Sequence, residues 1–275
     1  KVTEDKVIHV RVALMPRLAV LMNLDERETL KVFLNATKIL IPEVYKQTPW
    51  SASYLAQNHF EEMKDYFLKA TNVEEIQPGI ATIVGVAWFN GKKGSRNLLR
   101  SVLKKSSEAK GKMVDLAIHF LADQKKRNKA IKLYKKYLSE TDKNIVNEYS
   151  TAFLHLEEDK FQLYWPLLKA YCKSPVAFES PSYFFQYLLK CTKRFPKECL
   201  FLISNFNKYE KPNITESGYY DNEPIKVLVG AYNSLRNGNQ LNRRYINKTM
   251  KLFDKMLTDE RFRMTAEKIL IEVEA

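Results

Sequence analysis

The sequence predicts an all-α fold, an α-solenoid of HEAT- or TPR-like antiparallel helix pairs in a right-handed superhelix. Apolar residues recur at spacings of three and four through nearly the whole chain, which is the period of an amphipathic helix. Only 8 glycines and 10 prolines occur among 275 residues, too few turn signals for a many-stranded β fold. Roughly fourteen helical segments follow one another with a loose repeat of about 33–40 residues. An irregular helical bundle is the alternative.

Capping and breaking residues bound the helices of the first part of the chain. Asp25 follows a short break and can cap Glu26–Leu40, and Pro42 ends that helix. Asn58 is expected to cap the helix that follows it. Pro78 lies in the first turns of a very apolar segment, so that helix begins either at Glu74 or near Gln77. The other helices expected here are Val7–Met22, Ser51–Gln57, His59–Ala70, Glu74–Phe89 and Lys93–Ser106.

The second part of the chain continues the same pattern. Ser180 followed by Pro181 is a start signal for the helix after it, and Pro166 predicts a kink or a restart within another. Residues 208–222 carry Pro212 and Gly218 and are predicted to form a surface loop or insertion. The expected helices are Lys112–Leu121, Arg127–Leu138, Asn144–Leu156, Lys160–Cys172, Ser182–Arg194, Pro196–Phe206, Glu223–Arg236, Asn242–Leu257 and Arg261–Glu274.

Composition indicates a folded protein. Its length permits one long domain or two, and we expect a single α-solenoid domain over residues 1–275. Hydrophobic residues make up 45% and charged residues 28% of the chain, the balance of a folded protein. The chain begins at Lys1 inside an amphipathic pattern, so we interpret it as a fragment of a longer protein. No stretch of 18 apolar residues occurs, which predicts no membrane partner. Its 3 cysteines form no CxxC pair and favour a reduced, cytoplasmic protein.

Nearly all of the net positive charge lies in one segment. Lys92–Lys136 holds fifteen lysine or arginine residues against three acidic residues, a net charge of +12 out of +13 for the whole chain. The bias toward lysine is typical of an AT-rich genome, but such a bias does not explain why the excess is local. Localised positive charge attracts a polyanion.

Placed on helices, the basic segment forms two stripes. If the intervening helix is the inner member of a pair, the stripes adjoin across about 10 Å. A solvated lysine-rich face is the alternative to a binding surface. Lysine outnumbers arginine and the tyrosines take apolar positions, which favours protein or nonspecific phosphate contact over base reading. The predicted polyanion- or partner-binding residues are Lys93, Arg96, Arg100 and Lys104 on the first helix, and Lys125, Lys129, Lys132 and Lys136 on the second.

The sequence carries no catalytic, cofactor or metal motif, so we expect no enzyme activity in this chain. Gly85 to Lys92 fails as a phosphate loop, because five residues separate its glycines and Lys93 replaces the required Ser or Thr. The four histidines, His9, His59, His119 and His155, lie on different predicted helices without metal-ligand spacing. A helical-repeat enzyme such as a DNA glycosylase would need an aromatic and a carboxylate beside the basic groove; Trp50, Trp88 and Trp165 exist, but no acid can be placed beside them.

Dispersed positions give a family resemblance. Asp5 and Arg11 stand six apart before an apolar helix, which resembles a HEAT repeat; there, such an Asp and Arg pair between neighbouring repeats. The pattern continues at Val10-Arg11, Leu24-Asp25, Phe33, Tyr54-Leu55, His59-Phe60 and Gly79-Ile80-Ala81, and near the end at Phe253-Asp254, Met256-Leu257, Phe262-Arg263, Ala266 and Leu270. It is similar to the carboxy-terminal helical-repeat regions of large bacterial STAND-type (NACHT- and AVAST-like) anti-phage NTPases.

The resemblance implies a non-catalytic sensor module of a larger bacterial protein that binds a protein or other macromolecular trigger. In that family the NTPase and effector lie upstream of the repeats, and binding relieves autoinhibition. The second hypothesis is a HEAT-like nucleic-acid-binding domain that places the eight cations on phosphates. The partners expected are therefore a protein, other domains of the parent chain or nucleic acid.

Overall fold

The computed structural model describes residues 8–209, 223–236, 243–258 and 263. Over these residues the chain is helical throughout and contains no β-strand, which confirms the all-α prediction. It divides into two compact units, residues 1–130 and 131–275. Within each unit, helices pack mainly on neighbours one or two positions along the chain, as in an α-solenoid. The right-handed superhelix and the single domain remain predictions.

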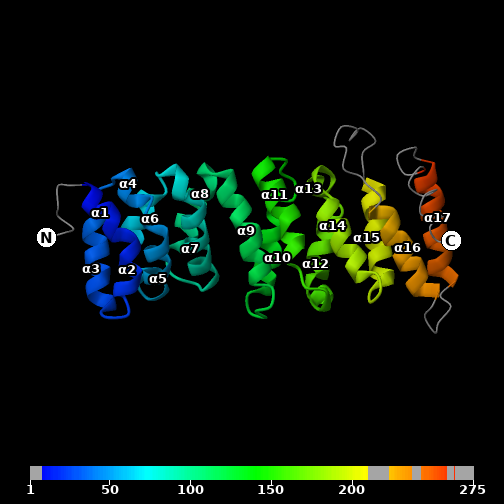
Figure 1. Ribbon diagram of the computed structural model, residues 1–275, viewed down its shortest axis with the longest axis horizontal. Helices are drawn as coiled ribbons and strands as arrows, with labels where there is room; N and C mark the ends of the chain where they lie inside the picture. Colours follow the sequence, from blue (N-terminus) through cyan, green and yellow to red (C-terminus); the bar gives the residue numbers. More distant parts are fainter. Residues whose placement is uncertain (1–7, 210–222, 237–242, 259–262, 264–275) are drawn as a thin grey trace. The chain divides into compact units, whose positions relative to one another are not determined.

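Unit 1, residues 1–130, is a succession of short helices (Figure 1). Helix α5 packs on α2, α3 and α7, and α7 packs in turn on α6, α8 and α9. The elements are α1 (Ile8–Leu14), η2 (Met15–Arg17), α2 (Leu18–Leu21), α3 (Glu26–Ala36), α4 (Pro42–Tyr45), α5 (Pro49–His59), α6 (Lys64–Ala70), η3 (Glu74–Ile76), α7 (Gln77–Phe89), α8 (Ser95–Lys105), α9 (Ser107–His119) and the start of α10 (Arg127–Lys136).

Prolines divide this unit more finely than the apolar periodicity indicates. The predicted helix Val7–Met22 is three elements, because Pro16 lies in a 3₁₀ turn between α1 and α2 and cannot donate a backbone hydrogen bond. Pro42 does not end the preceding helix. That helix stops at Ala36, and Pro42 is instead the first residue of α4, a position that proline favours.

One of the two predicted caps is correct. Asp25 Oδ1 accepts a hydrogen bond from the backbone N–H of Glu28 at 2.9 Å and begins α3 as expected. Asn58 caps nothing, because α5 continues through His59. Its side chain donates instead to Glu26 Oε1 at 2.8 Å. Hydrophobic periodicity alone did not separate these two uses of a short polar residue.

Helix α7 is the central element of unit 1. It begins at Gln77, the later of the two predicted starts, with Pro78 in its first turn. Eight of its thirteen residues are buried, since α5, α6, α8 and α9 all pack around it. The stacked rings of Phe89 and Phe120, with centroids 4.3 Å apart, join its end to the end of α9.

Helices α8 and α9 meet at Ser106, which is both the C-cap of the first and the N-cap of the second. Its hydroxyl accepts from the backbone N–H of Ala109 at 3.0 Å, as a capping serine does. Helix α9 therefore starts at Ser107, five residues before the predicted Lys112. It packs on α7 and α8.

Unit 2, residues 131–275, repeats the neighbour-to-neighbour pattern. Helix α14 packs on α11, α15 and α16, and α17 packs on α15 and α16. Its elements beyond α10 are α11 (Lys143–Ala152), η4 (Phe153–His155), η5 (Glu158–Lys160), α12 (Phe161–Tyr171), α13 (Pro175–Glu179), α14 (Ser182–Cys191), α15 (Pro196–Tyr209), α16 (Glu223–Arg236) and α17 (Arg243–Leu257).

The prolines of unit 2 have different outcomes. Helix α12 runs through Pro166, so the predicted restart is wrong and the alternative, a kink, stays a prediction. Pro175 opens α13, a helix absent from the prediction, behind a Ser174 cap. The start signal at Ser180-Pro181 is confirmed, because α14 begins at Ser182, but the residue at the N-cap is Pro181 and no side chain caps the helix. The Ser180 hydroxyl donates instead to Ser150 Oγ at 2.9 Å. Most of the predicted 208–222 loop and of the Arg261–Glu274 helix lies outside the described residues.

Candidate polyanion-binding surface

The first basic stripe lies on α8, a strongly amphipathic helix. Its apolar residues Leu98, Leu99, Val102 and Leu103 are buried. Arg96, Arg100 and Lys104 are exposed on the other side, where their long side chains reach solvent. Lys93 is exposed too, although it lies in the turn before α8 rather than on the helix. We call Lys93, Arg96, Arg100 and Lys104 the α8 face.

Few acidic side chains neutralise the positive charge of the α8 face. None of its four cations forms an ion pair with a side chain in the described part of the chain. Glu61 is the nearby acid, and Lys64 and Lys93 together hold its pKa below the ordinary value, the Lys64 hydrogen bond most strongly. Neighbouring unpaired cations repel one another, and an anionic partner removes that repulsion.

The second stripe, on α10 and the turn before it, is less uniform than predicted. Lys125, Lys132 and Lys136 are exposed. Lys129 is not a free cation: its ammonium donates to the main-chain oxygen of Trp88 at 2.6 Å and lies 3.6 Å from the centroid of the Trp88 ring. This lysine therefore joins α10 to the end of α7.

Lys126 makes a parallel contact that sequence reasoning missed. It donates to Asn90 Oδ1 at 2.8 Å, pairs with Asp123 Oδ2 at 3.1 Å and lies over the Phe120 ring. Lysines near a helix C-terminus complement its exposed carbonyls and the negative end of its dipole. Nothing in a run of lysines distinguishes those that bind a neighbouring helix from those that face solvent.

The pKa of Lys129 shows that the cations of α8 and α10 influence one another. Burial lowers this pKa from its ordinary value, and the positive charges of Lys126 and Arg96 lower it further. Arg96 of the α8 face and Lys129 of α10 thus share one positive region within unit 1. Whether the complete stripes adjoin remains a prediction, because Lys132 and Lys136 belong to unit 2.

Among the described residues, the aromatic rings near these cations are buried or already covered; Lys136 itself lies over the ring of buried Tyr137. Tyr134 and Tyr137 of α10 are buried, as their apolar positions predicted, and α8 contains no aromatic residue. Lys129 covers Trp88. The surface can therefore bind anions through charge and hydrogen bonding, but it offers no platform on which a nucleic-acid base would stack.

Among the other candidate groups, His59 and the cysteines are buried. His59 is buried between Glu62, 3.0 Å from its Nδ1, and Glu26, 3.3 Å from its Nε2. Burial raises the pKa of the Cys172 and Cys191 thiols to about 12, which suppresses the reactive thiolate. Among the described residues no cluster of three or more His, Cys, Asp or Glu side chains could hold a metal ion. No described helix is long and apolar enough to cross a membrane.

Of the predicted inter-repeat pair, Asp5 and Arg11, the structure describes only Arg11. Arg11 lies on α1, whereas Asp5 is outside the described residues.

Comparison with family models, curated proteins and solved structures finds no match to this chain. The described chain thus defines an α-solenoid protein with a localised basic surface, and its relationship to the STAND-type sensors stays a prediction.

Proposed function

We propose that this chain is a non-catalytic recognition module, and that the α8 face docks an acidic surface of a partner protein. The supporting observation is the exposure of Arg96, Arg100 and Lys104 on one helix, without ion-pair partners in the described chain. A folded helix fixes these charges in space, so a partner with carboxylates at matching spacing loses little conformational entropy on binding. Complementary charge of this kind chiefly increases association rate and specificity.

Nucleic acid is the competing partner, and the buried tyrosines disfavour it. A DNA- or RNA-binding face of the same charge would gain from rings beside its cations, and here those rings face the core. Arginine forks suited to phosphate number only two on the α8 face, Arg96 and Arg100.

Fluorescence anisotropy with two labelled probes separates these partners. The probes are poly-L-glutamate of about 30 residues and a 20-base-pair duplex DNA, titrated at about 50 mM salt and again at higher salt. We expect poly-L-glutamate to bind, and we expect the quadruple variant K93Q/R96Q/R100Q/K104Q to lose at least about tenfold in affinity, equal to about 1.4 kcal/mol.

A matched variant controls for net charge. K31Q/K38Q/K190Q/K226Q removes the same four charges from exposed positions elsewhere and should bind poly-L-glutamate as the parent protein does. Equal losses in both quadruple variants would show that only net charge matters and would refute a docking face. Preference for the duplex, with a salt slope reduced by about 3 to 4 in the α8 variant, would establish the nucleic-acid alternative.

The sensor role is the more specific form of this proposal. It predicts that the gene encoding this chain also encodes a P-loop NTPase upstream of Lys1. A complete gene without an NTPase would remove the STAND-type hypothesis and leave the recognition module intact.

A further inference from the structure

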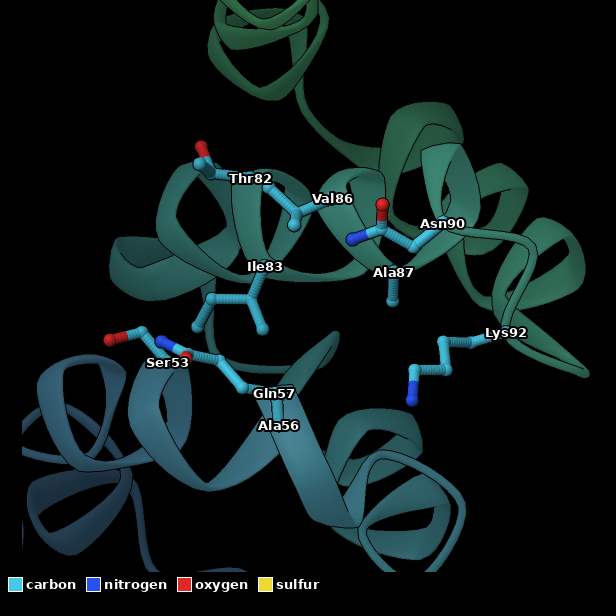
Figure 2. A pocket seen from close by; sticks show the side chains of 9 residues that line it. All are labelled: Ser53, Ala56, Gln57, Thr82, Ile83, Val86, Ala87, Asn90 and Lys92. Atoms are coloured by element: carbon cyan, nitrogen blue, oxygen red, sulfur yellow. The ribbon is translucent and has the colours of Figure 1, made fainter. Parts of the chain in front are cut away.

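An open groove lies between α5 and α7 in unit 1, beside the start of the α8 face (Figure 2). It encloses about 450 Å³, which is within the usual range of binding pockets. Its lining comes from α5, from α7 and from the turn after α7, and includes Ser53, Ala56, Gln57, Ile83, Ala87 and Lys92.

The groove exists because small residues face one another. Figure 2 shows Ala87 of α7 directed into the hollow, with Ala56 of α5 on the opposite side and Ile83 forming an apolar wall. Larger side chains at the two alanines would close the space, since both are 7% exposed or less. The result is an apolar floor large enough for one aliphatic side chain.

The turn that ends α7 is a Schellman motif with an unusual residue. Lys92 N–H donates to the carbonyl of Ala87 at 2.9 Å and Gly91 N–H to that of Trp88 at 3.1 Å, while Gly91 takes the required left-handed conformation at φ 75°. In this motif an apolar side chain at the position of Lys92 frequently packs on the position of Ala87. Here a lysine and an alanine occupy those positions, and both line the groove. Departures from a local rule concentrate at functional sites.

Charge at the groove rim is positive. The Lys92 ammonium has no hydrogen-bond or ion-pair partner among the described side chains, and Figure 2 shows it at one end of the hollow. The next residue along the chain begins the α8 face. The two nearby acids are engaged, Glu61 by Lys64 and Asp123 by Lys126.

Amide groups add hydrogen-bonding capacity at the rim. The Lys126 ammonium donates a hydrogen bond to Asn90 Oδ1 at 2.8 Å. The Nδ2 group of Asn90 is therefore the donor that a ligand could use. Gln57 is exposed on the α5 side, and its amide has no described partner. An extended peptide presents main-chain donors and acceptors to such groups.

We propose that the groove binds one aliphatic side chain of an extended acidic segment of the partner protein. A carboxylate next to that side chain pairs with Lys92, and the acidic residues that follow lie on the α8 face. This inference rests on the proposed recognition function, and it adds to charge a requirement for one apolar residue in the partner.

Two labelled ten-residue peptides test the inference in anisotropy titrations at about 50 mM salt. Both carry four consecutive glutamates, preceded by leucine in one peptide and by serine in the other. We expect the leucine peptide to bind about 10- to 100-fold more tightly, the ratio that burial of an aliphatic side chain produces. Poly-L-glutamate is titrated in parallel to measure binding to the α8 face alone.

Variants locate the effect in the groove. Ala87→Leu should reduce the leucine-to-serine affinity ratio to about one while poly-L-glutamate binding persists, which also shows that the variant is folded. Lys92→Gln changes a half-buried side chain with little effect on packing, and it should weaken the leucine peptide about three- to tenfold. Lys38→Gln, an exposed lysine of the same unit, should leave it unchanged.

The outcomes distinguish the two proposals. Equal binding of the two peptides to the parent protein, with poly-L-glutamate bound, overturns the groove inference alone. Failure of all three probes overturns it together with the recognition function. A leucine preference that survives both Ala87→Leu and Lys92→Gln places the apolar contact elsewhere and also overturns it.

Discussion

The packing of α7 against α9 depends on the absence of a side chain at Gly85. A Cβ atom at this position would lie 2.5 Å from Leu116 Cδ2 and 3.1 Å from Met113 Cε, both well inside van der Waals contact. Gly79, six residues earlier on the same helix, offers a comparison. There an added Cβ would meet Pro49 alone, at ordinary distances of 3.5 Å from its Cβ and 3.9 Å from its Cγ.

The same substitution should therefore have opposite effects at the two sites. Replacing glycine with alanine in a helix stabilises by about 0.5–1 kcal/mol, with the smaller gain expected at Gly79 in the first turn. At Gly85 this gain is opposed by overpacking of a closely packed core, which costs about 1–3 kcal/mol. We expect Gly85→Ala to destabilise unit 1 by about 1 kcal/mol and Gly79→Ala to stabilise it by about 0.5 kcal/mol.

Urea unfolding followed by tryptophan fluorescence measures both changes. In a Trp165→Phe background the signal comes from Trp50 and Trp88, both in unit 1. A loss of 1 kcal/mol should lower the urea midpoint by about 0.3–0.5 M. Equal midpoints for the two alanine variants would refute the conclusion that α7 and α9 pack too closely at Gly85 to accept a side chain.

Three further predictions concern pH, thiol chemistry and capping. Burial raises the pKa of five core tyrosines, so their hydroxyls stay neutral in the folded protein but ionise near pH 10 in the unfolded chain. The contribution of each tyrosine to the free energy of unfolding is therefore complete below pH 10. Above pH 10 the free energy of unfolding falls by about 1.4 kcal/mol per pH unit for each tyrosine. Alkaline unfolding should therefore coincide with the delayed tyrosinate absorbance at 295 nm, and early ionisation of all tyrosines would contradict it. The tyrosines are Tyr45, Tyr66, Tyr134, Tyr149 and Tyr187. The three buried cysteines should resist iodoacetamide at pH 8 until urea unfolds the chain, as mass spectrometry would show. Asp25→Ala should cost about 1 kcal/mol through loss of the α3 cap, whereas Asp25→Asn should retain most of it in the same urea assay.

The sequence predicted which segments are helical better than it predicted where each helix begins and ends. The apolar faces of α8 and α10 were predicted correctly, because amphipathic periodicity reports burial directly. Pro16, Pro42 and Pro175 were misjudged or overlooked, because proline serves equally to break a helix and to begin one. Only the surrounding packing decides between these uses.

The sequence predicted where along the chain the positive charge is concentrated, but not which of the lysines face solvent. Counting residues found the segment that carries the positive charge, yet Lys126 and Lys129 bond to the end of α7 while Lys125 and Lys132 remain exposed. Their partners, Asn90 and the Trp88 carbonyl, lie 36 and 41 residues away in the chain. The groove beside Lys92 was equally hidden, since it depends on two alanines from different helices facing each other.

The burial of α7 has a consequence for how unit 1 opens. Each of α5, α6, α8 and α9 touches α7, so any one of them can detach while the others still hold it. Amide hydrogens of α7 should then exchange last, at a free energy close to that of unfolding the whole unit. Helix α8, with one side in solvent, opens earlier, and a bound acidic partner should slow its exchange selectively.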